Sequence, residues 1–398
     1  MRDIGAHMTG VSHLLSTFGY AMAVLLSCLI LPSCAQAQPA SKTNAEGVTV
    51  VTSSGELRRF LEARNPPQEI ALAPGRYETI VLSNRAFATP VRITSADPQS
   101  PAILAGVKLQ GVSNFSISNI SLRPAERPSA AGRYGMLVLQ SDRIVIEDVA
   151  FVGPGTEISK HHVAGLMLRE SSDLTVRRNY FRNFRHGLTM LKVTNTRIAL
   201  NEFERLQTDA IRGGGVTDLQ IHHNVMTDFR PAEGDHPDGI QLWSTRQKEP
   251  GRNIEIAGNL VVRGAGGPTQ GVFVRDTKLR LPFENITIRD NLIIGSLYNG
   301  IAVIGADGVS VRGNAVYSTS DRKSWIRLQS VLNASSRGNA AQQFIYRDII
   351  EAVSQADNRV NEPVDDGEQA IIEGWLEGQS GFPSYRGPVL RGLLADGM

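Results

Sequence analysis

The sequence predicts an all-β fold, a right-handed single-stranded parallel β-helix in which each coil stacks on the coil before it. Two observations support this prediction: a repeated segment that ends on Asn or Asp, and a second repeated segment that begins with Gly. Self-similarity at the period of one structural unit is the sequence signature of a solenoid. Equivalent side chains of adjacent coils would lie about 4.8 Å apart, so residues distant in sequence become neighbours on one face.

The first repeat is a polar turn, an alternating apolar segment, an Asn or Asp, and a short apolar run. Its closest members, Asn179 and Asn201, are 22 residues apart, which we take as one bare coil; longer spacings indicate inserted loops. Asn and Asp tolerate left-handed turns and can stack as hydrogen-bonded ladders, so we expect a structural role for them. The recurring residue is found at Asn119, Asp148, Asn179, Asn201, Asn224, Asn259, Asn291 and Asn314.

The second repeat reads Gly-apolar-x-apolar and predicts one further strand in each coil. Alternation along a strand sends the apolar residues inward and the residues between them outward. Its members are Gly135–Val138, Gly165–Leu168, Gly187–Met190, Gly239–Leu242, Gly271–Val274 and Gly300–Val303.

The first 37 residues have the features of an export signal. Arg2 supplies positive charge, Tyr20–Leu31 is an apolar run, and Ala35–Ala37 is a small-x-small cleavage site. The apolar run is short for a membrane helix, so we expect no membrane span in the mature chain and a periplasmic or secreted location. A retained anchor, or a lipid attached at Cys34, is the alternative. Residues 38–47 are predicted to be a flexible linker.

The β-helix domain is predicted to span residues 48–350. Ser53 and Glu56 match a capping box that opens a short helix over the exposed first coil. Residues 351–398 lack the Asn template, and we interpret them as a C-terminal cap or tail with a short helix at Glu368–Leu376.

Composition narrows the range of partners. The net charge is +2 over 398 residues, which gives no reason to expect a nucleic-acid partner. Both cysteines, Cys28 and Cys34, lie in the predicted signal, so the mature chain would have no thiol chemistry. We expect a monomer.

Ionisable and polar side chains gather on the outward positions of four consecutive Gly-apolar strands. Asp209 and Asp238 directly precede equivalent strands of neighbouring coils, and Asp235 and His236 lie on the loop that leads into one of them. Inserted loops on a solenoid commonly form the walls of a binding cleft. The candidate catalytic residues are Asp209, Arg212, Asp235, His236, Asp238 and Arg275. The candidate substrate-binding residues are His186, Lys192, Gln241, Trp243 and Gln270.

The coil template and this polar face resemble the pectate-lyase-like superfamily of right-handed parallel β-helices over residues 48–350. The segments Gly234–Trp243, Gly251–Gly264 and Gln270–Asp276 are also similar to β-helix segments of secreted, alginate-modifying proteins. The resemblance implies an enzyme that acts on an acidic polysaccharide rich in uronic acids.

Two kinds of lyase-like chemistry fit these residues. In β-elimination a base removes the C5 proton of a uronate, an acid protonates the leaving oxygen, and the uronate carboxylate must be neutralised. Arg212 and Arg275 supply permanent positive charge, and His236 or His186 is the candidate base. The nearby Asp residues would orient the histidine or hold Ca²⁺, the one candidate cofactor, although no residue is assigned as a metal ligand. A uronate C5-epimerase needs nearly the same groups.

Inverting hydrolysis is the alternative, because it needs two carboxyl groups about 6.5–9.5 Å apart, which Asp209 and an Asp of the next coil can provide. Thr208–Ala210 resembles the Asp turn of polygalacturonases. Their Gly-His-Gly and Arg-Ile-Lys motifs are replaced here by Thr269–Gly271 and Ile301–Val303, so the hydrolase is the second interpretation. A non-catalytic polysaccharide-binding solenoid is the third.

Overall fold

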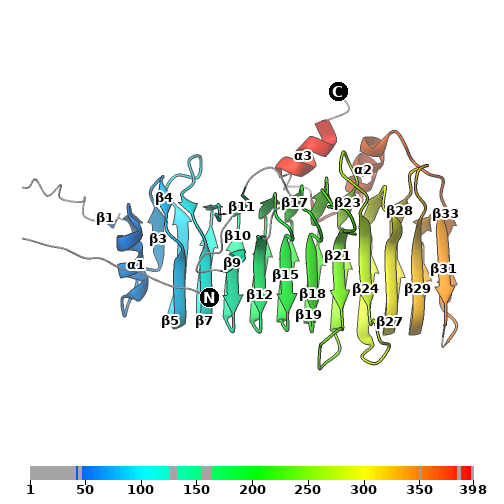
Figure 1. Cartoon of the computed structure of the whole chain (residues 1–398), viewed down its shortest axis with the longest axis horizontal. Helices are drawn as coiled ribbons and strands as arrows, with labels where there is room; N and C mark the ends of the chain where they lie inside the picture. Colours follow the sequence, from blue (N-terminus) through cyan, green and yellow to red (C-terminus); the bar gives the residue numbers. More distant parts are fainter. Residues whose placement is uncertain are drawn as a thin grey trace, which may run out of the picture. The chain divides into compact units, whose positions relative to one another are not determined.

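The computed structural model describes residues 42–43, 47–125, 132–154, 163–349, 351–382 and 387–395. Within them the predicted parallel β-helix is the fold (Figure 1). A regular coil contributes two strands to a 21-stranded sheet and one short strand to a 12-stranded sheet, counted over the described residues. The predicted export signal and most of the predicted linker lie outside the described residues.

Apart from β1 (Lys42–Thr43), which pairs antiparallel with β2, the strands fall into four groups by their place in the coil. First strands of the regular coils are β9 (Tyr134–Leu139), β12 (Ala164–Arg169), β15 (Leu188–Leu191), β18 (Ile211–Gly214), β21 (Asp238–Trp243), β24 (Gln270–Arg275) and β31 (Gln343–Arg347). Second strands are β2 (Val48–Val51), β3 (Glu69–Leu72), β10 (Asp142–Glu147), β13 (Ser172–Arg177), β16 (Thr194–Ala199), β19 (Thr217–His222), β22 (Arg252–Ala257), β25 (Phe283–Arg289) and β32 (Ser354–Ala356). Long strands that run through both places are β5 (Ile80–Ser95), β7 (Val107–Ser118), β27 (Tyr298–Arg312) and β29 (Ser324–Arg337). The 12-stranded sheet holds β4 (Arg76–Tyr77), β6 (Ile103–Leu104), β8 (Ser121–Leu122), β11 (Ala150–Val152), β14 (Tyr180–Arg182), β17 (Glu202–Glu204), β20 (Val225–Thr227), β23 (Leu260–Val262), β26 (Leu292–Ile294), β28 (Ala315–Tyr317), β30 (Ala340–Ala341) and β33 (Arg359–Val360).

Side chains at equivalent positions form continuous columns inside the solenoid. Phe151, Phe181 and Phe203 stack on one another with ring centroids 4.4 and 4.7 Å apart. The repeated glycine is needed beside this column: a Cβ on Gly187 would lie 2.5 Å from the carbonyl oxygen of Ala210 and 2.6 Å from the Phe203 ring. The Gly-apolar repeat therefore marks where the backbone meets the core and the next coil.

The predicted asparagine ladder is present inside the turns, from Asn179 to Asn314, and continues through Asn339 to Asn358. In each step a side-chain amide donates to the oxygen of the next Asn, as between Asn179 and Asn201 at 2.9 Å. The ladder residues from 179 to 339 are at most 1% exposed. Asn119 and Asp148 do not join the ladder; they occupy the left-handed position one residue earlier, at φ values of 52° and 53°, which is the other structural role expected of the recurring Asn or Asp.

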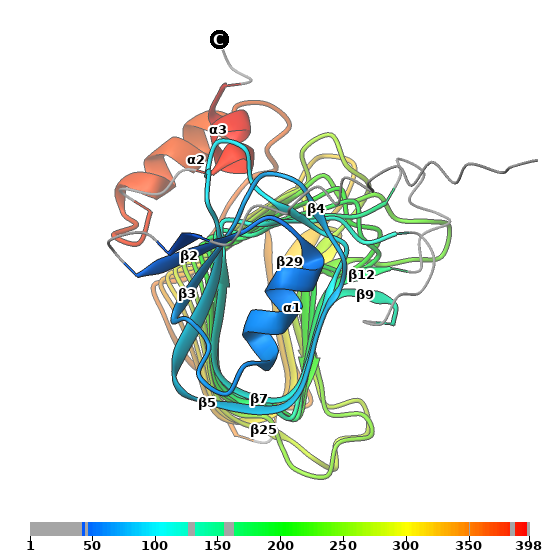
Figure 2. The same cartoon turned by 90° about the vertical axis from the view of Figure 1, so that its left-hand side faces the viewer.

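A helix covers the N-terminal end of the solenoid, as the sequence predicts. The predicted capping helix is present as α1 (Ser54–Glu62), whose Leu57 and Leu61 are buried in the main core. Figure 2 shows α1 lying across the first coil. The strands continue to β33, past the predicted end at residue 350.

The C-terminal helices α2 (Glu368–Glu377) and α3 (Pro388–Ala395) lie against the flank of the solenoid rather than across its far end (Figure 2). They pack on an apolar cluster that includes Val225, Leu260 and Leu292 of the 12-stranded sheet. The buried carboxylate of Glu202 accepts hydrogen bonds from the backbone N–H groups of Val389 and Leu390, both at 3.0 Å. The outward apolar residues of this sheet explain why the tail covers a flank.

Candidate functional site

The outward residues of β15, β18, β21 and β24 lie in the register that the sequence predicts. Thr189, Arg212, Gln241 and Phe273 are Cα partners from coil to coil. We call this surface the acidic face, because Asp209 and Asp238 lie at the start of its two central strands.

Asp209 and Asp238 are brought into direct contact. The backbone N–H of Asp238 donates to Asp209 Oδ1 at 3.1 Å, and the Gln241 side-chain amide donates to Asp238 Oδ2. The sequence predicted that both carboxyl groups face a groove, but Asp209 is only 3% exposed and Asp238 is 0% exposed. Asp238 Oδ1 has no hydrogen-bond partner among the described residues.

Burial sets the protonation of this pair. Burial, and then the negative charge of Asp209, raise the pKa of Asp238 well above its usual range. Burial also raises the pKa of Asp209, while the Arg212 guanidinium opposes that rise. Two neighbouring buried carboxyl groups cannot both hold a negative charge cheaply, so one of them keeps a proton at higher pH than an exposed Asp does.

Arg212 joins the carboxyl pair to two other predicted residues. Its Nη1 lies 2.9 Å from Asp209 Oδ2 and 3.2 Å from His186 Nδ1, and its guanidinium carbon lies 4.8 Å from the centre of the Trp243 ring. Thr208 Oγ1 also contacts His186 Nδ1. Burial, followed by the charges of Arg212 and Arg185, lowers the pKa of His186 to about 3, so this imidazole is neutral at neutral pH.

The loop before β21 holds Asp235 beside this centre but leaves His236 at the surface. Asp235 Oδ2 accepts hydrogen bonds from the Gln207 side chain at 2.7 Å and from the Ala232 backbone at 3.1 Å. His236 is exposed. The loop carboxylate is therefore anchored to the neighbouring coil.

Two predicted site residues lie apart from the carboxyl pair, and a third, Gln270, is the neighbour of Asp238 on the next coil. Lys192 is on the turn after β15, where its Nζ lies 3.5 Å from Glu170. Arg275 is the Cα partner of Trp243 and is exposed one coil further along. Gln270 is the Cα partner of Asp238, and its Oε1 accepts a hydrogen bond from Asn299.

Sequence analysis missed Thr208, Gln207 and Tyr134. Thr208 and Gln207 directly precede Asp209, so their contacts depend on how the chain turns into β18. Tyr134 is the Cα partner of Ala164, three coils before Asp209; burial raises its pKa, and the charge of Arg212 opposes that rise. Extending the predicted four-coil row by two coils would have found Tyr134.

No three His, Cys, Asp or Glu residues of the described part of the chain lie close enough together to hold a metal ion. No residue is therefore assigned to calcium. No helix among the described residues is long and apolar enough to cross a membrane.

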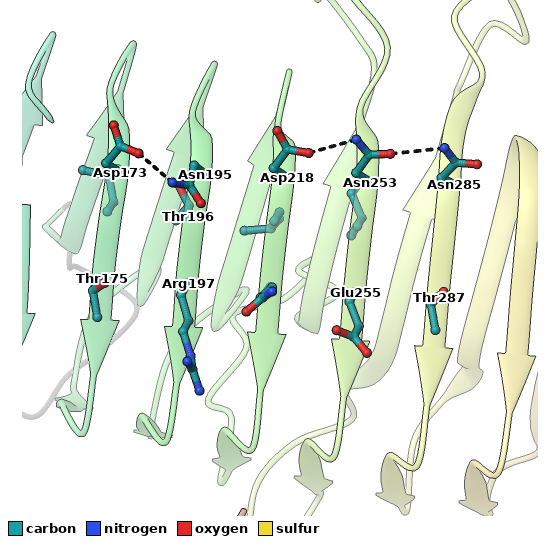
Figure 3. A pocket seen from close by; sticks show the side chains of 14 residues that line it. Asp173, Thr175, Asn195, Thr196, Arg197, Asp218, Asn253, Glu255, Asn285 and Thr287 are labelled. Atoms are coloured by element: carbon teal, nitrogen blue, oxygen red, sulfur yellow. Dashed lines mark hydrogen bonds between the residues drawn. The ribbon is translucent and has the colours of Figure 1, made fainter. Parts of the chain in front are cut away.

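A groove of about 700 Å³ lies on another surface, the outer side of the second strands β13, β16, β19, β22 and β25 (Figure 3). We call this surface the ladder face, after its exposed row of Asn and Asp side chains, which is separate from the buried asparagine ladder inside the coils. Its rim is a row of side chains in which Asn195 bonds to Asp173, and Asn253 bonds to both Asp218 and Asn285, at 2.6 to 3.1 Å. All five residues have left-handed φ values of 48° to 54°.

Residues 105–316 match the family described as right handed beta helix region, which is more than half of the chain. The chain belongs to this family. The match concerns the right-handed β-helix in general, so the finer resemblance to the pectate-lyase-like superfamily stays a prediction. No curated protein sequence matches the chain.

Several solved structures share the coiled architecture at low sequence identity. An alginate lyase from Paenibacillus sp. str. FPU-7 is 13% identical with a TM-score of 0.42, covering 79% of this chain and 99% of that one. DFA-IIIase from Arthrobacter chlorophenolicus A6 is 10% identical with a TM-score of 0.49, covering 78% and 87%. The surface adhesin PfbA of Streptococcus pneumoniae is 13% identical with a TM-score of 0.46, covering 77% and 82%. At these scores the likeness says nothing about the activity of this chain.

Proposed function

We propose that this protein is an exported enzyme that cleaves or epimerises an acidic polysaccharide, with its chemical centre at Asp209, Asp238, Arg212 and His186. The observation that supports this proposal is the buried pair of neighbouring residues Asp209 and Asp238, joined by the hydrogen bond from the Asp238 backbone N–H to Asp209 Oδ1. Perturbed pKa values of this kind are concentrated at catalytic sites, because acid–base chemistry near neutral pH needs them.

Each carboxyl group has a distinct role in the proposal. Asp238, whose raised pKa keeps a proton on it, is the general acid that protonates the leaving glycosidic oxygen. Asp209 is the base, since its raised pKa makes it a stronger base than an ordinary carboxylate. The neutral His186 is too weak a base for this role and instead helps to position Arg212.

Arg212 favours elimination or epimerisation over hydrolysis. Removing the C5 proton of a uronate builds negative charge on its carboxylate, which a fixed guanidinium stabilises. Glycoside hydrolysis builds positive charge on the sugar ring, which the same guanidinium would oppose. Hydrolysis remains the second candidate, because the carboxyl pair alone contains the acid and the base that it requires.

Substrate access requires a rearrangement, because Asp238 is fully buried. The side chains of Gln241 and Arg212 contact the two carboxyl groups directly, and they lie on the outward row. A bound uronate would take over both contacts: its carboxylate would accept from Arg212, and its hydroxyl groups would bond to Gln241.

A panel of polysaccharides distinguishes these functions. The purified chain is incubated with uronate-rich and neutral polymers, and three signals are measured. Ultraviolet absorbance of an unsaturated uronate indicates elimination, and new reducing ends without that absorbance indicate hydrolysis. Proton exchange at C5 without cleavage indicates epimerisation. The absence of all three signals on every polymer would contradict an enzymatic role.

N-terminal sequencing of the exported protein tests the predicted cleavage after Ala37.

A further inference from the structure

A row of neighbouring residues, whose side chains are hydrogen-bonded to one another from Gln270 onward, leads from the carboxyl pair toward the C-terminal coils. Asp238 and Gln270 are Cα partners, the Asn299 side-chain amide donates to Gln270 Oε1 at 2.5 Å, and the Trp325 indole N–H donates to Asn299 Oδ1 at 3.0 Å. Asn299 and Trp325 are also Cα partners. The row advances three coils, or about 14 Å at the usual spacing of strands.

The row ends at an aromatic pair. The rings of Tyr298 and Trp325 are stacked, with centroids 5.2 Å apart and planes 24° apart. Tyr298 is 50% exposed and has a φ of 59°, a left-handed conformation that is uncommon for a bulky residue. Left-handed φ values recur at turns throughout the described coils, so the exposed, stacked ring rather than the backbone conformation distinguishes this position.

The contacts also fix the orientation of the pair. The indole N–H of Trp325 is tied to Asn299, and the backbone N–H of Tyr298 donates to the carbonyl of Lys323 at 2.8 Å. A rigid aromatic surface loses little conformational entropy on binding, and the apolar face of a sugar ring suits it. Its place at the end of the row distinguishes it from an isolated exposed aromatic residue.

We propose that Tyr298 and Trp325 form a sugar-stacking subsite for a glycan chain that lies along the solenoid axis with its reacting bond at Asp209 and Asp238. This inference rests on the proposed function. A hexose unit advances a glycan by about the spacing of one coil, so about three sugar units separate the reacting bond from the subsite. The amide groups of Gln270 and Asn299 line the path between them.

The first test compares substrates of increasing length. For wild type and Trp325→Ala, kcat and KM are measured on oligosaccharides of two to six units cut from the polymer that the enzyme processes. Trp325→Ala should raise KM about tenfold for the longest chains, leave the shortest unchanged, and leave kcat unchanged at every length. Trp325→Phe should lose less, because it keeps an aromatic ring.

Two controls separate stacking from a general disturbance of the fold. Tyr298→Asn removes the second ring while keeping a residue that tolerates the left-handed φ, and it should give the same length dependence. Val360→Ala truncates another exposed apolar residue, 73% exposed on β33, and should change nothing. An equal loss on short and long chains, or no loss on long chains, would overturn the subsite.

Calorimetric titration with six-unit chains cut from each uronate-rich polymer of the panel, whether or not the enzyme processes it, separates failure of the subsite from failure of the proposed chemistry. If wild type binds the chains but does not process them, weaker binding by Trp325→Ala, with normal binding by Asp238→Asn, supports the subsite and removes the enzymatic function. If wild type binds none of the chains, or Trp325→Ala binds as tightly as wild type, the subsite is refuted.

Discussion

Two faces of the same coils carry rows of polar side chains. On the ladder face these side chains are hydrogen-bonded to one another, whereas on the acidic face buried carboxyl groups lie close together. On the ladder face, Asn253 donates to Asp218 Oδ1 at 2.8 Å and accepts from Asn285 at 3.1 Å. On the acidic face, Asp238 Oδ1 is buried without a described hydrogen-bond partner, and the pKa of Asp238 is raised by burial and by Asp209.

The difference shows how structural and functional rows can be told apart in a solenoid. The ladder face repeats Asn or Asp at one left-handed position, which suits the turn that each of these coils makes there. The acidic face changes residue type at each coil, from Thr189 to Arg212 to Gln241 to Phe273. Hydrogen-bonded stacking from coil to coil needs similar side chains at equivalent positions. A row of unlike side chains therefore indicates a role other than holding the coils together.

The largest expected difference between the faces is in activity. Asp238→Asn removes the proposed general acid and should lower kcat by about 100-fold or more, with an unchanged circular dichroism spectrum. The matched change on the ladder face, Asp218→Asn, keeps an acceptor for Asn253 and should leave kcat unchanged. Initial rates on the processed polymer measure both. An active Asp238→Asn enzyme would move the chemistry elsewhere, and an inactive Asp218→Asn enzyme would assign it to the groove of the ladder face.

Stability as a function of pH should show a smaller difference. The folded-state pKa of Asp238 is raised above its unfolded value of about 3.9, so folding favours the protonated form. Its contribution is fully present below the unfolded pKa and is lost as the pH rises toward the folded pKa. Asp238→Asn cannot ionise, so its Tm relative to wild type should increase between pH 4 and pH 7, by roughly 1–3 °C.

Asp218→Asn is the control for this measurement too, because Asp218 is an exposed residue of the ladder face. Its Tm relative to wild type should change little over the same pH range. Scanning calorimetry at several pH values measures both variants. A Tm difference for Asp238→Asn that falls as the pH rises would mean that the carboxylate is stabilised in the folded chain, and the assignment of Asp238 as the acid would then fail.

The periodicity of the sequence was enough to predict the coils and the rows of residues that they align. The features that depend on side-chain packing could not be predicted in this way. Coil spacing was enough to place Asp209 beside Asp238 and Arg212 in the same row as Gln241. The Asn template did not distinguish the ladder position from the left-handed position before it, because Asn and Asp suit both, and so Asn119 was aligned with the ladder residues.

Burial was the main feature that the sequence could not supply. Asp238 is enclosed by contacts that depend on rotamers, such as that of Gln241, and on the path of the loop before β21. The tail helix at 368–377 was predicted, but its docking surface required knowing that Leu260 and Leu292 face outward on the 12-stranded sheet.

The smallest expected effect is on stability. It separates the two contributions that Asn253 makes to the turn on the ladder face: its side-chain hydrogen bonds and its tolerance of a left-handed backbone. Asn253→Ala removes the hydrogen bonds to Asp218 and Asn285 and leaves a φ of 54° to a residue without the polar side chain that lets Asn or Asp tolerate it, which costs about 1 kcal/mol. Asn253→Gly removes the same bonds without that strain. Urea unfolding should therefore show a loss of about 1 kcal/mol for Asn253→Ala and a smaller loss for Asn253→Gly, with normal activity in both. Equal losses would mean that the exposed hydrogen bonds stabilise the turn more than its backbone conformation does. A shared loss of activity would make the ladder face part of the functional surface, because strain cannot act in the glycine variant.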